Sequence, residues 1–219
     1  MAKIRLDQLL VDRGLAASRE RAKRRIMAGE VLVDEQKIDK AGTMVKPEAK
    51  IRLLGEDLPY VSRGGLKLEK AMKTFGVTLD GKVAADIGAS TGGFTDVLLK
   101  NGAEKVFAVD VGYGQLAWSL RQDERVVNME RTNIRHISPE QIPEALDLAV
   151  ADLSFISLKL VLPAISSVLK DKAQLVCLIK PQFEAGKDEV GKKGVVRDES
   201  VHLAVIESIL DFVPTIGLT

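Results

Sequence analysis

The sequence predicts an α/β fold in which a doubly wound parallel sheet follows a small α+β module. From residue 81 onward, apolar runs of strand length alternate with helical patterns, which is typical of a mostly parallel sheet with helices on both faces. Residues 1–60 instead contain two short helical patterns followed by short strands between polar turns. We expect a boundary near residues 55–60, with domains spanning residues 1–58 and 59–219.

The N-terminal module is predicted to begin with two helices. The first carries three leucines at helical spacing before a stop at Gly14, namely Leu6, Leu9 and Leu10. The second is expected between a capping Ser18 and Gly29. Short strands are expected at Val31–Val33 and Ile51–Leu53.

The larger domain is predicted to contain at least four buried strands. They are Val83–Ile87, Val106–Val109, Leu146–Ala151 and Leu175–Ile179. After the first strand, Phe94, Val97 and Leu98 occupy one face of a helix that stops at residues 101–102. A capping serine followed by proline also predicts a helix beginning at Ser138–Gln141.

Composition excludes several classes of protein. The 219 residues are 46% hydrophobic, enough for a real core, and the net charge of +1 allows nucleic-acid binding only through a local patch. The one cysteine, Cys177, lies in an apolar run, which fits a reducing cytoplasm. With two histidines we expect no metal site. Because no signal core or long apolar run occurs, we expect no membrane association.

A glycine-rich loop joins the first strand of the larger domain to its helix. Such a loop lets the backbone approach a ligand and presents the free N–H groups of the helix to it. We expect Asp86 and the residues after it to bind a cofactor: Gly88, Ala89, Ser90, Thr91, Gly92, Gly93 and Phe94. Asp110 closes the next strand, where a carboxylate would hold a ribose diol.

Two details of this loop favour S-adenosylmethionine as the cofactor. The glycines at positions 88, 92 and 93 do not match the G-x-G-x-x-G pattern of dinucleotide sites. The negative charge of Asp86 would repel a pyrophosphate but suit an ammonium and a sulfonium. A dinucleotide site and a glycine-rich turn without a cofactor remain as alternatives.

Polar residues end the apolar strands of the predicted sheet. Besides Asp86 and Asp110, these are Asp152 and Lys180, and a lysine in this place is costly unless it is paired or used. Lys67, on a helix starting near Gly65, is a further candidate. A lysine with a depressed pKa could act as general base for methyl transfer to a hydroxyl, with Asp152 holding it in position. The alternative is that Lys180 and Asp152 form an ion pair with a purely structural role.

Four sequence blocks resemble the TlyA family of hemolysin A-type proteins, S-adenosylmethionine-dependent rRNA 2′-O-methyltransferases related to FtsJ. The blocks are residues 60–68, 86–96, 151–157 and 179–184. The resemblance implies a Rossmann-like methyltransferase domain with a Lys-Asp-Lys-Glu tetrad, of which Lys67, Asp152 and Lys180 match the motif. The fourth member, a glutamate on a later strand, has no counterpart, so the domain is expected to lack its last strands. Residues 1–53 resemble the αL-type RNA-binding domain of a ribosomal small-subunit protein.

The second helix of the N-terminal module is strongly basic. Its cations are Arg19, Arg21, Lys23, Arg24 and Arg25. Arg21, Arg24 and Arg25 share one face of the helix and could contact the phosphates of ribosomal RNA. Such contacts position a protein without reading the sequence. The alternative is a solvated basic face. The oligomeric state is left open.

The leading hypothesis is therefore an enzyme that methylates ribose 2′-hydroxyls of ribosomal RNA. A membrane-active haemolysin and a non-catalytic RNA-binding or assembly factor are the alternatives. His136 and His202 are expected to be structural or solvated, and Trp118 and Tyr113 to pack in the core unless they cover an adenine ring.

Overall fold

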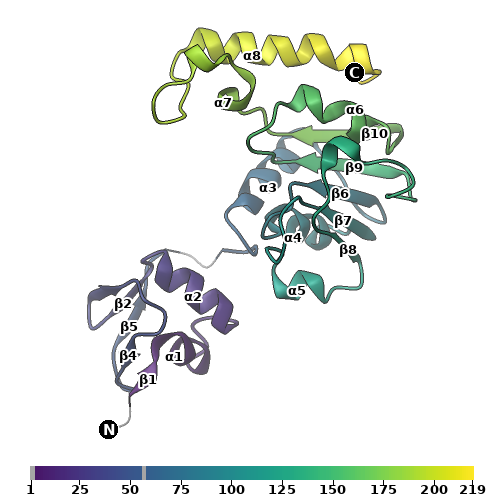
Figure 1. Cartoon of the computed structure of the whole chain (residues 1–219). Helices are drawn as coiled ribbons and strands as arrows, with labels where there is room; N and C mark the ends of the chain where they lie inside the picture. Colours follow the sequence, from purple (N-terminus) through teal and green to yellow (C-terminus); the bar gives the residue numbers. More distant parts are fainter. Residues whose placement is uncertain (1–2, 56–57) are drawn as a thin grey trace. The chain divides into compact units, whose positions relative to one another are not determined.

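The computed structural model describes residues 3–55 and 58–219, and the chain divides into two compact units, residues 1–57 and 58–219. Residues 56 and 57, within the expected boundary, lie outside the described residues. The expected fold class is confirmed, because the larger unit contains a parallel sheet with helices on both faces (Figure 1).

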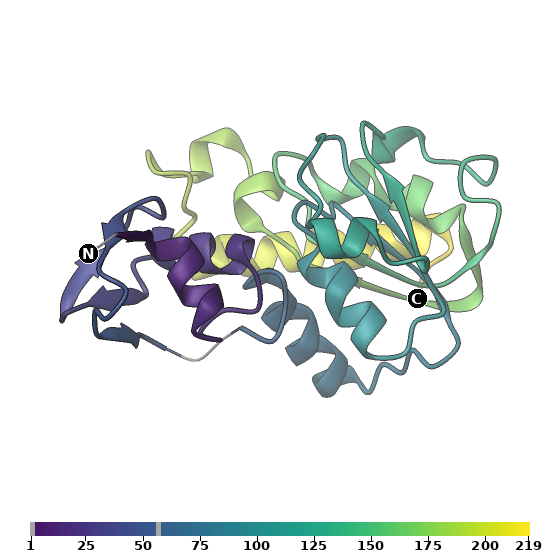
Figure 2. The same ribbon diagram turned by 90° about the horizontal axis from the view of Figure 1, so that it is seen from below.

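The N-terminal unit is a small α+β structure. Its elements are β1 (Ile4–Arg5), α1 (Leu6–Asp12), α2 (Arg19–Met27), β2 (Val31–Val33), β3 (Gln36–Ile38), β4 (Met44–Val45) and β5 (Ile51–Leu53). Strand β2 lies between β3 and β5, both antiparallel to it, and β1 pairs with β4. Helices α1 and α2 pack together (Figure 2) and bury Leu6, Leu10 and Ile26 in one core.

Both predicted helices of this unit are confirmed. The leucine pattern forms α1, and Gly14 follows with a φ of 67°, a left-handed conformation that suits glycine. Ser18 caps α2, since its Oγ accepts a hydrogen bond from the Arg21 N–H at 3.2 Å.

The larger unit alternates strands and helices as the sequence predicts. Its principal elements are α3 (Gly64–Phe75), β6 (Val83–Ile87), α4 (Gly93–Lys100), β7 (Lys105–Val109), α5 (Trp118–Arg121), β8 (Val126–Met129), β9 (Leu146–Ala151), α6 (Leu162–Ser166), β10 (Leu169–Cys177), α7 (Pro181–Glu184) and α8 (Glu199–Phe212). Short 3-10 turns lie at Ile134–His136, Leu158–Leu160, Lys187–Glu189 and Val213–Ile216.

The five strands form one parallel sheet in the order β10-β9-β6-β7-β8. The chain starts at the central strand β6, adds β7 and β8 on one side, and then crosses back to add β9 on the other. This reversal makes a topological switch point between β6 and β9, where open α/β sheets bind their ligands. The register pairs Asp86 of β6 with Ala108 of β7 and Val150 of β9.

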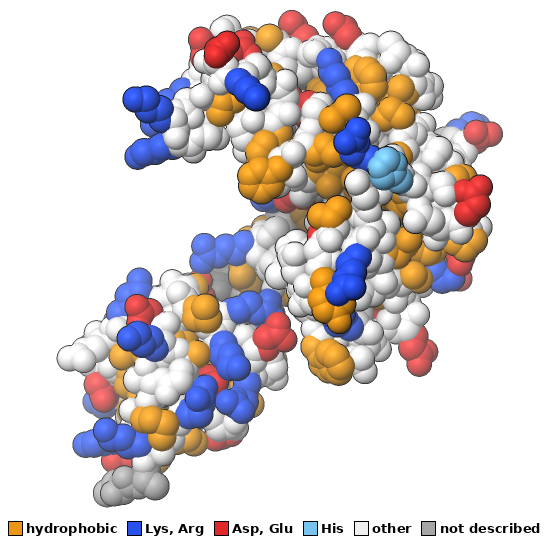
Figure 3. All heavy atoms as spheres, in the orientation of Figure 1, with side chains coloured by type: hydrophobic (Ala, Val, Ile, Leu, Met, Phe, Trp, Pro, Cys, Tyr) orange, Lys and Arg blue, Asp and Glu red, His pale blue; other side chains and the backbone are white. Residues whose placement is uncertain are grey.

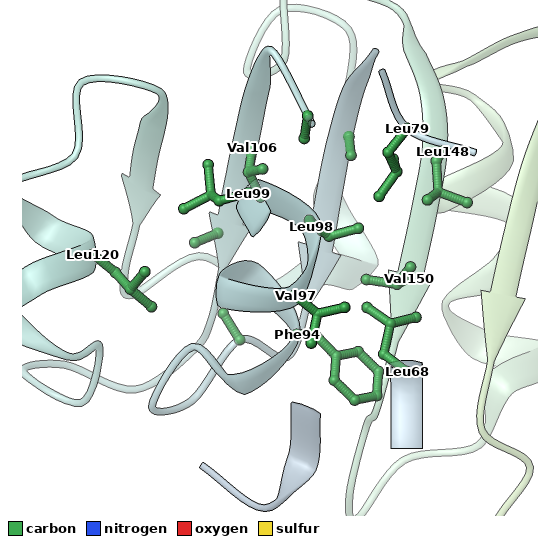
Figure 4. Packing of buried hydrophobic residues seen from close by; sticks show 14 of the residues in the cluster. Leu68, Leu79, Phe94, Val97, Leu98, Leu99, Val106, Leu120, Leu148 and Val150 are labelled. Carbon is green, nitrogen blue, oxygen red and sulfur yellow. The ribbon is translucent and has the colours of Figure 1, made fainter. Parts of the chain in front are cut away.

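Alternate residues of each strand point to opposite faces of the sheet. On one face, Ala84, Val106 and Leu148 pack against α3, α4 and α5, which contribute Leu68, Phe94 and other apolar side chains (Figure 4). The other face packs against α6, α8 and the 3-10 turns, whose buried side chains include Leu162, Ile165 and Ile209. The sheet is thus covered on both sides, and its strand ends are left for a site.

Three sequence-based expectations fail in detail. The helix expected at Ser138–Gln141 is a single turn, because Pro143 lacks a donor N–H and biases the residue before it away from helix. The last predicted strand begins earlier and ends at Cys177, so Lys180 follows the strand end. Tyr113 and Trp118 are 68% and 67% exposed and do not pack in the core.

The segment before α3 is tied to α4. The ring of Tyr60 is buried, and the carboxylate of Asp96 on α4 accepts the Val61 N–H at 2.8 Å. Gly65 lies against Tyr60 so closely that a Cβ there would come within 2.7 Å of the ring. This contact sets the start of α3, and with it the place of Lys67 one turn later.

We expect Gly65→Ala to destabilise the larger unit by about 1–3 kcal/mol, the usual range for overpacking. The neighbouring Gly64→Ala is the matched control, since its Cβ would meet only Ser62 Oγ at 3.3 Å. Thermal unfolding of both variants measures the difference. Equal stability of the two would contradict the proposed contact.

Candidate active site

A pocket of about 320 Å³ opens at the carboxyl ends of β6 and β9, at the switch point of the sheet. Segments far apart in sequence line it: Ser62, Gly64, Lys67, Asp86, Gly88, Ala89, Ser90, Thr91, Gly93, Phe94, Asp152, Ser154 and Lys180. These residues come from the start of α3, the β6–α4 loop, the segment after β9 and the residue preceding α7. Three of the four resembling sequence blocks therefore meet the glycine loop here.

The glycines of the β6–α4 loop permit close packing. A Cβ at Gly93 would lie 2.2 Å from Ser62 Oγ and 3.0 Å from the Gly65 nitrogen, so α3 and α4 meet at their N-termini only because that side chain is absent. Gly88 has a φ of 86°, and a Cβ there would approach the side chain of Leu153 to 3.0 Å. The loop is thus pressed against both segments that carry the lysine and carboxylate candidates.

Two of the expected cofactor residues also make contacts that shape the loop. The carboxylate of Asp110, after β7, accepts backbone N–H groups from Ser90 at 2.8 Å and Gly112 at 2.7 Å, which holds the loop in shape. Gly92 has a φ of 90°, and a Cβ there would lie 2.2 Å from a methyl of Leu120. Neither is among the lining residues of the pocket, whereas the other expected cofactor residues are.

Asp86 is the most buried charged residue of the site, with 1% of its surface exposed. Its Oδ2 accepts hydrogen bonds from the backbone N–H of Thr95 at 2.8 Å and from Thr95 Oγ1 at 2.7 Å. Burial raises the pKa of the Asp86 carboxyl to about 7, although the bonds from Thr95 oppose this change; the charges of Asp152 and Asp110 add to it. A cation in the pocket would favour its ionised form.

Both lysine candidates contact the same carboxylate. Lys67 Nζ donates to Asp152 Oδ2 at 2.8 Å, and Lys180 Nζ lies 2.5 Å from Asp152 Oδ1 in an ion pair. Lys180 also donates to Ser154 Oγ at 3.0 Å. The side chains of Asp152 and Lys180 are mostly buried, while that of Lys67 is about half exposed.

Charge is not balanced within this group. Burial alone would raise the pKa of the Asp152 carboxyl, but the bonds from Lys180 and Lys67 outweigh burial and hold the pKa below its usual value. Asp152 therefore remains ionised, and it neutralises only one of the two ammonium groups around it.

Sequence reasoning missed the aromatic pair beside the lysines. Phe155 is 90% exposed, adopts a φ of 64°, and lies against Phe183 with ring centroids 5.2 Å apart. A left-handed phenylalanine is uncommon and strained. In the sequence, only the position of Phe155 directly after Ser154 connects it with the site. Neither its exposure nor its backbone angle follows from residue type.

The basic residues of α2 differ in their surroundings. Arg25 is buried, donates to the Leu54 and Gly55 carbonyls and pairs with Glu30, so its guanidinium contributes to the structure of the unit. Arg19 pairs with the buried Asp7, and Arg24 pairs with Glu20. Lys23 is exposed, and Arg21 is partly exposed.

The described part of the chain offers neither a metal cluster nor a membrane-spanning helix. Among residues 3–55 and 58–219, His, Cys, Asp and Glu form no group of three or more that could hold a metal ion. Within the same ranges, none of the helices combines the length and apolar character that crossing a bilayer requires.

An open parallel sheet with a glycine loop and carboxylates at its switch point defines a nucleotide-type cofactor-binding α/β enzyme domain. Residues 60–215 match the model of the FtsJ-like methyltransferases, and residues 4–51 match the S4 domain. The chain therefore belongs to the FtsJ-like methyltransferase family and is a methyltransferase with an S4 domain at its N-terminus.

Similar proteins extend over most of the chain. YqxC of Bacillus subtilis, which is named as an rRNA methyltransferase, is 54% identical over 96% of this chain and 75% of its own length. The 16S/23S rRNA (cytidine-2′-O)-methyltransferase TlyA of Mycobacterium tuberculosis is 50% identical over 90% of this chain and 74% of its own. A solved structure from Streptococcus thermophilus carries the name hemolysin and is 48% identical to this chain. The match covers 99% of this chain and 80% of the solved one, with a TM-score of 0.75.

The raised pKa of Asp86 has a consequence for stability. Between its ordinary pKa of 3.8 and about 7, the folded chain keeps a proton that the unfolded chain has lost. We therefore expect the stability of the native chain relative to Asp86→Asn to fall as pH rises from 4 to about 7, and then to stay level. Calorimetric unfolding across this pH range measures it.

Asp80→Asn, at an exposed aspartate of the same unit, is the control for this measurement. Its stability relative to the native chain should change little between pH 5 and 8. A native chain that gains stability relative to Asp86→Asn on going from pH 5 to 7 would contradict the raised pKa.

Proposed function

We propose that this chain transfers a methyl group from S-adenosylmethionine to the 2′-hydroxyl of a ribose in ribosomal RNA. The observation that carries the proposal is the group of Lys67, Asp152 and Lys180 at the mouth of the glycine-loop pocket. Membership of the FtsJ-like family and the names of the relatives support methyl transfer to ribosomal RNA.

The pocket fits S-adenosylmethionine in charge. Asp86 and Asp152 both line it, and their carboxylates suit a ligand that carries an ammonium and a sulfonium. The N-terminus of α4 begins at Gly93 beside the pocket and offers free N–H groups for the carboxylate of the ligand. Gly88 lines the pocket, and a Cβ at this position would lie 3.0 Å from the side chain of Leu153. When bound, the cofactor supplies a methyl group that is already activated by its positive sulfur.

The lysines would then act on the acceptor. A ribose hydroxyl is a weak nucleophile, so a group must take its proton as the new oxygen–carbon bond forms. We assign this role to Lys180, because Asp152 and Ser154 both hold its amine at the pocket mouth. Asp152 orients the amine and stays charged; Lys67 keeps Asp152 paired while Lys180 is a neutral amine, and Lys180 becomes an ammonium paired with Asp152 once it takes the proton.

The remaining surfaces suit an RNA substrate. Lys and Arg side chains gather on the visible face of the N-terminal unit, which matches the S4 domain (Figure 3). The exposed ring of Phe155 lies next to Ser154 and offers a flat face on which an unstacked base can rest. We propose that the first surface holds RNA phosphates and the second holds a base near the reacting ribose.

Incubation with unmodified ribosomal subunits and labelled S-adenosylmethionine, followed by mapping of the methylated ribose, tests the function. We expect the native chain to incorporate methyl groups at a 2′-oxygen. Lys180→Ala should lower the rate by about 100-fold or more, the usual contribution of a general base. Cofactor affinity, measured by calorimetry, should change less than about threefold because the glycine loop is intact.

Lys180→Arg is the matched variant for this test, since it keeps the positive charge but a guanidinium does not take up a proton. It should be as inactive as Lys180→Ala. An active Lys180→Arg would remove the role of Lys180 as base. RNA binding without methyl incorporation by the native chain would instead favour a non-catalytic factor.

Lys23 on α2 is the exposed cation best suited to test the RNA surface. We expect Lys23→Ala to weaken binding of ribosomal RNA evenly across sequences and to lower the slope of log affinity against log salt by about one. Lys23→Arg should leave both unchanged. Filter binding between 50 and 200 mM salt, about the range in which such contacts respond, measures the slope. An unchanged slope for Lys23→Ala would show that this residue contacts no phosphate.

A further inference from the structure

One carboxylate outside the pocket joins the two segments that carry Asp152 and Lys180. Glu184, the last residue of α7, accepts the Ser157 hydroxyl through Oε2 at 2.6 Å. Its Oε1 accepts the backbone N–H of Leu158 at 2.7 Å. Both donors lie a few residues after Asp152, at the start of a 3-10 turn that Ser157 itself caps by accepting the Lys159 N–H. Hydrogen bonds to an ionised group are among the stronger ones in proteins.

Lys180 depends on α7 for its position. It is the residue that precedes the helix, and its carbonyl accepts the Phe183 N–H at 2.9 Å. Helix α7 has only four residues, and a single turn does not hold its own shape in water. Its backbone supplies one further bond, from the Ala185 N–H to the Pro181 carbonyl. Contacts outside the turn must therefore hold it, and the two bonds to Glu184 are polar contacts that reach the segment after Asp152.

The two segments also meet at their reactive ends. Lys180 Nζ contacts Asp152 and Ser154, and Phe183 lies against Phe155. Glu184 adds a further contact between the two segments, and it is not among the residues that line the pocket. A change in its bonds would move the turn, and Lys180 with it, relative to Asp152.

We propose that Glu184 is a positioning residue that holds Lys180 against Asp152 through Ser157 and Leu158. This inference rests on the proposed function, in which Lys180 must be in position to take the proton from the acceptor hydroxyl. Glu184 touches neither the pocket nor the acceptor, so it acts on the rate through the geometry of Lys180. Cofactor binding, which depends on the β6–α4 loop, is independent of it.

Glu184→Gln tests the proposal at nearly constant volume. The amide is uncharged and places an NH2 group where one of the two carboxylate oxygens lies, so in the same position one of the two donors no longer faces an acceptor. We expect kcat to fall about tenfold, the change that follows from loss of one charge-assisted hydrogen bond. The dissociation constant of S-adenosylmethionine should stay within about twofold of the native value, and the KM for RNA likewise. The pH dependence of kcat should also shift, because the contact of Lys180 with Asp152 is altered.

Two further variants keep the test informative. Ser157→Ala removes one of the two bonds without changing the carboxylate, and we expect an effect on kcat in the same direction but smaller. Glu207→Gln, at an exposed glutamate of α8, is the matched control and should behave as the native chain. In the double variant Ser157→Ala with Glu184→Gln, the losses should be less than additive because both act on one contact.

The outcomes are separable. A native kcat in Glu184→Gln overturns the positioning role. A loss of cofactor affinity and of thermal stability in parallel with kcat also overturns it, since it indicates a general structural defect. If the native chain methylates no ribose, the proposed function itself is rejected. The native chain is therefore assayed before any variant is compared with it.

Discussion

The parallel direction of the five strands is the constraint on which the rest of the structure depends. Parallel strands bring all their carboxyl ends to one edge of the sheet, and the reversal of strand order between β6 and β9 opens a crevice there. Because β6 and β9 are hydrogen-bonded neighbours, the loops that follow them cannot lie far apart. The Asp86 loop and the Asp152 segment therefore share one pocket.

Close packing around glycine then brings the third segment into that pocket. Helix α3 reaches the β6–α4 loop because Gly65 has no side chain to clash with the Tyr60 ring and Gly93 leaves room for Ser62. Carboxylates fix each part from behind: Asp96 holds Val61, Asp110 holds the loop, and Glu184 holds the turn after Lys180. Hydrogen bonds to these carboxylates hold the segments that carry Lys67, Asp152 and Lys180, which limits the freedom of these side chains before any ligand binds.

Electrostatics divides the acidic residues of the site into two kinds. Asp86 is almost fully buried, and burial raises its pKa to about 7. Asp152 is held ionised by two ammonium groups, so it serves as a fixed charge that orients them. The same residue type thus takes two roles, because one environment is apolar and the other is cationic.

The sequence by itself determined the alternation of strands and helices, the glycine loop, and the residues at the strand ends, since apolar periodicity and glycine placement are local properties. Strands β6 and β9 agree with prediction to the residue. Only the tertiary structure decided that Asp110 accepts the Ser90 N–H, that Gly92 lies against Leu120, that Arg25 is buried, and that Phe155 is exposed in a left-handed conformation. It also brought Glu184 against Ser157 and Leu158. These facts depend on which distant segments meet, and neither residue type nor spacing along the chain carries that information.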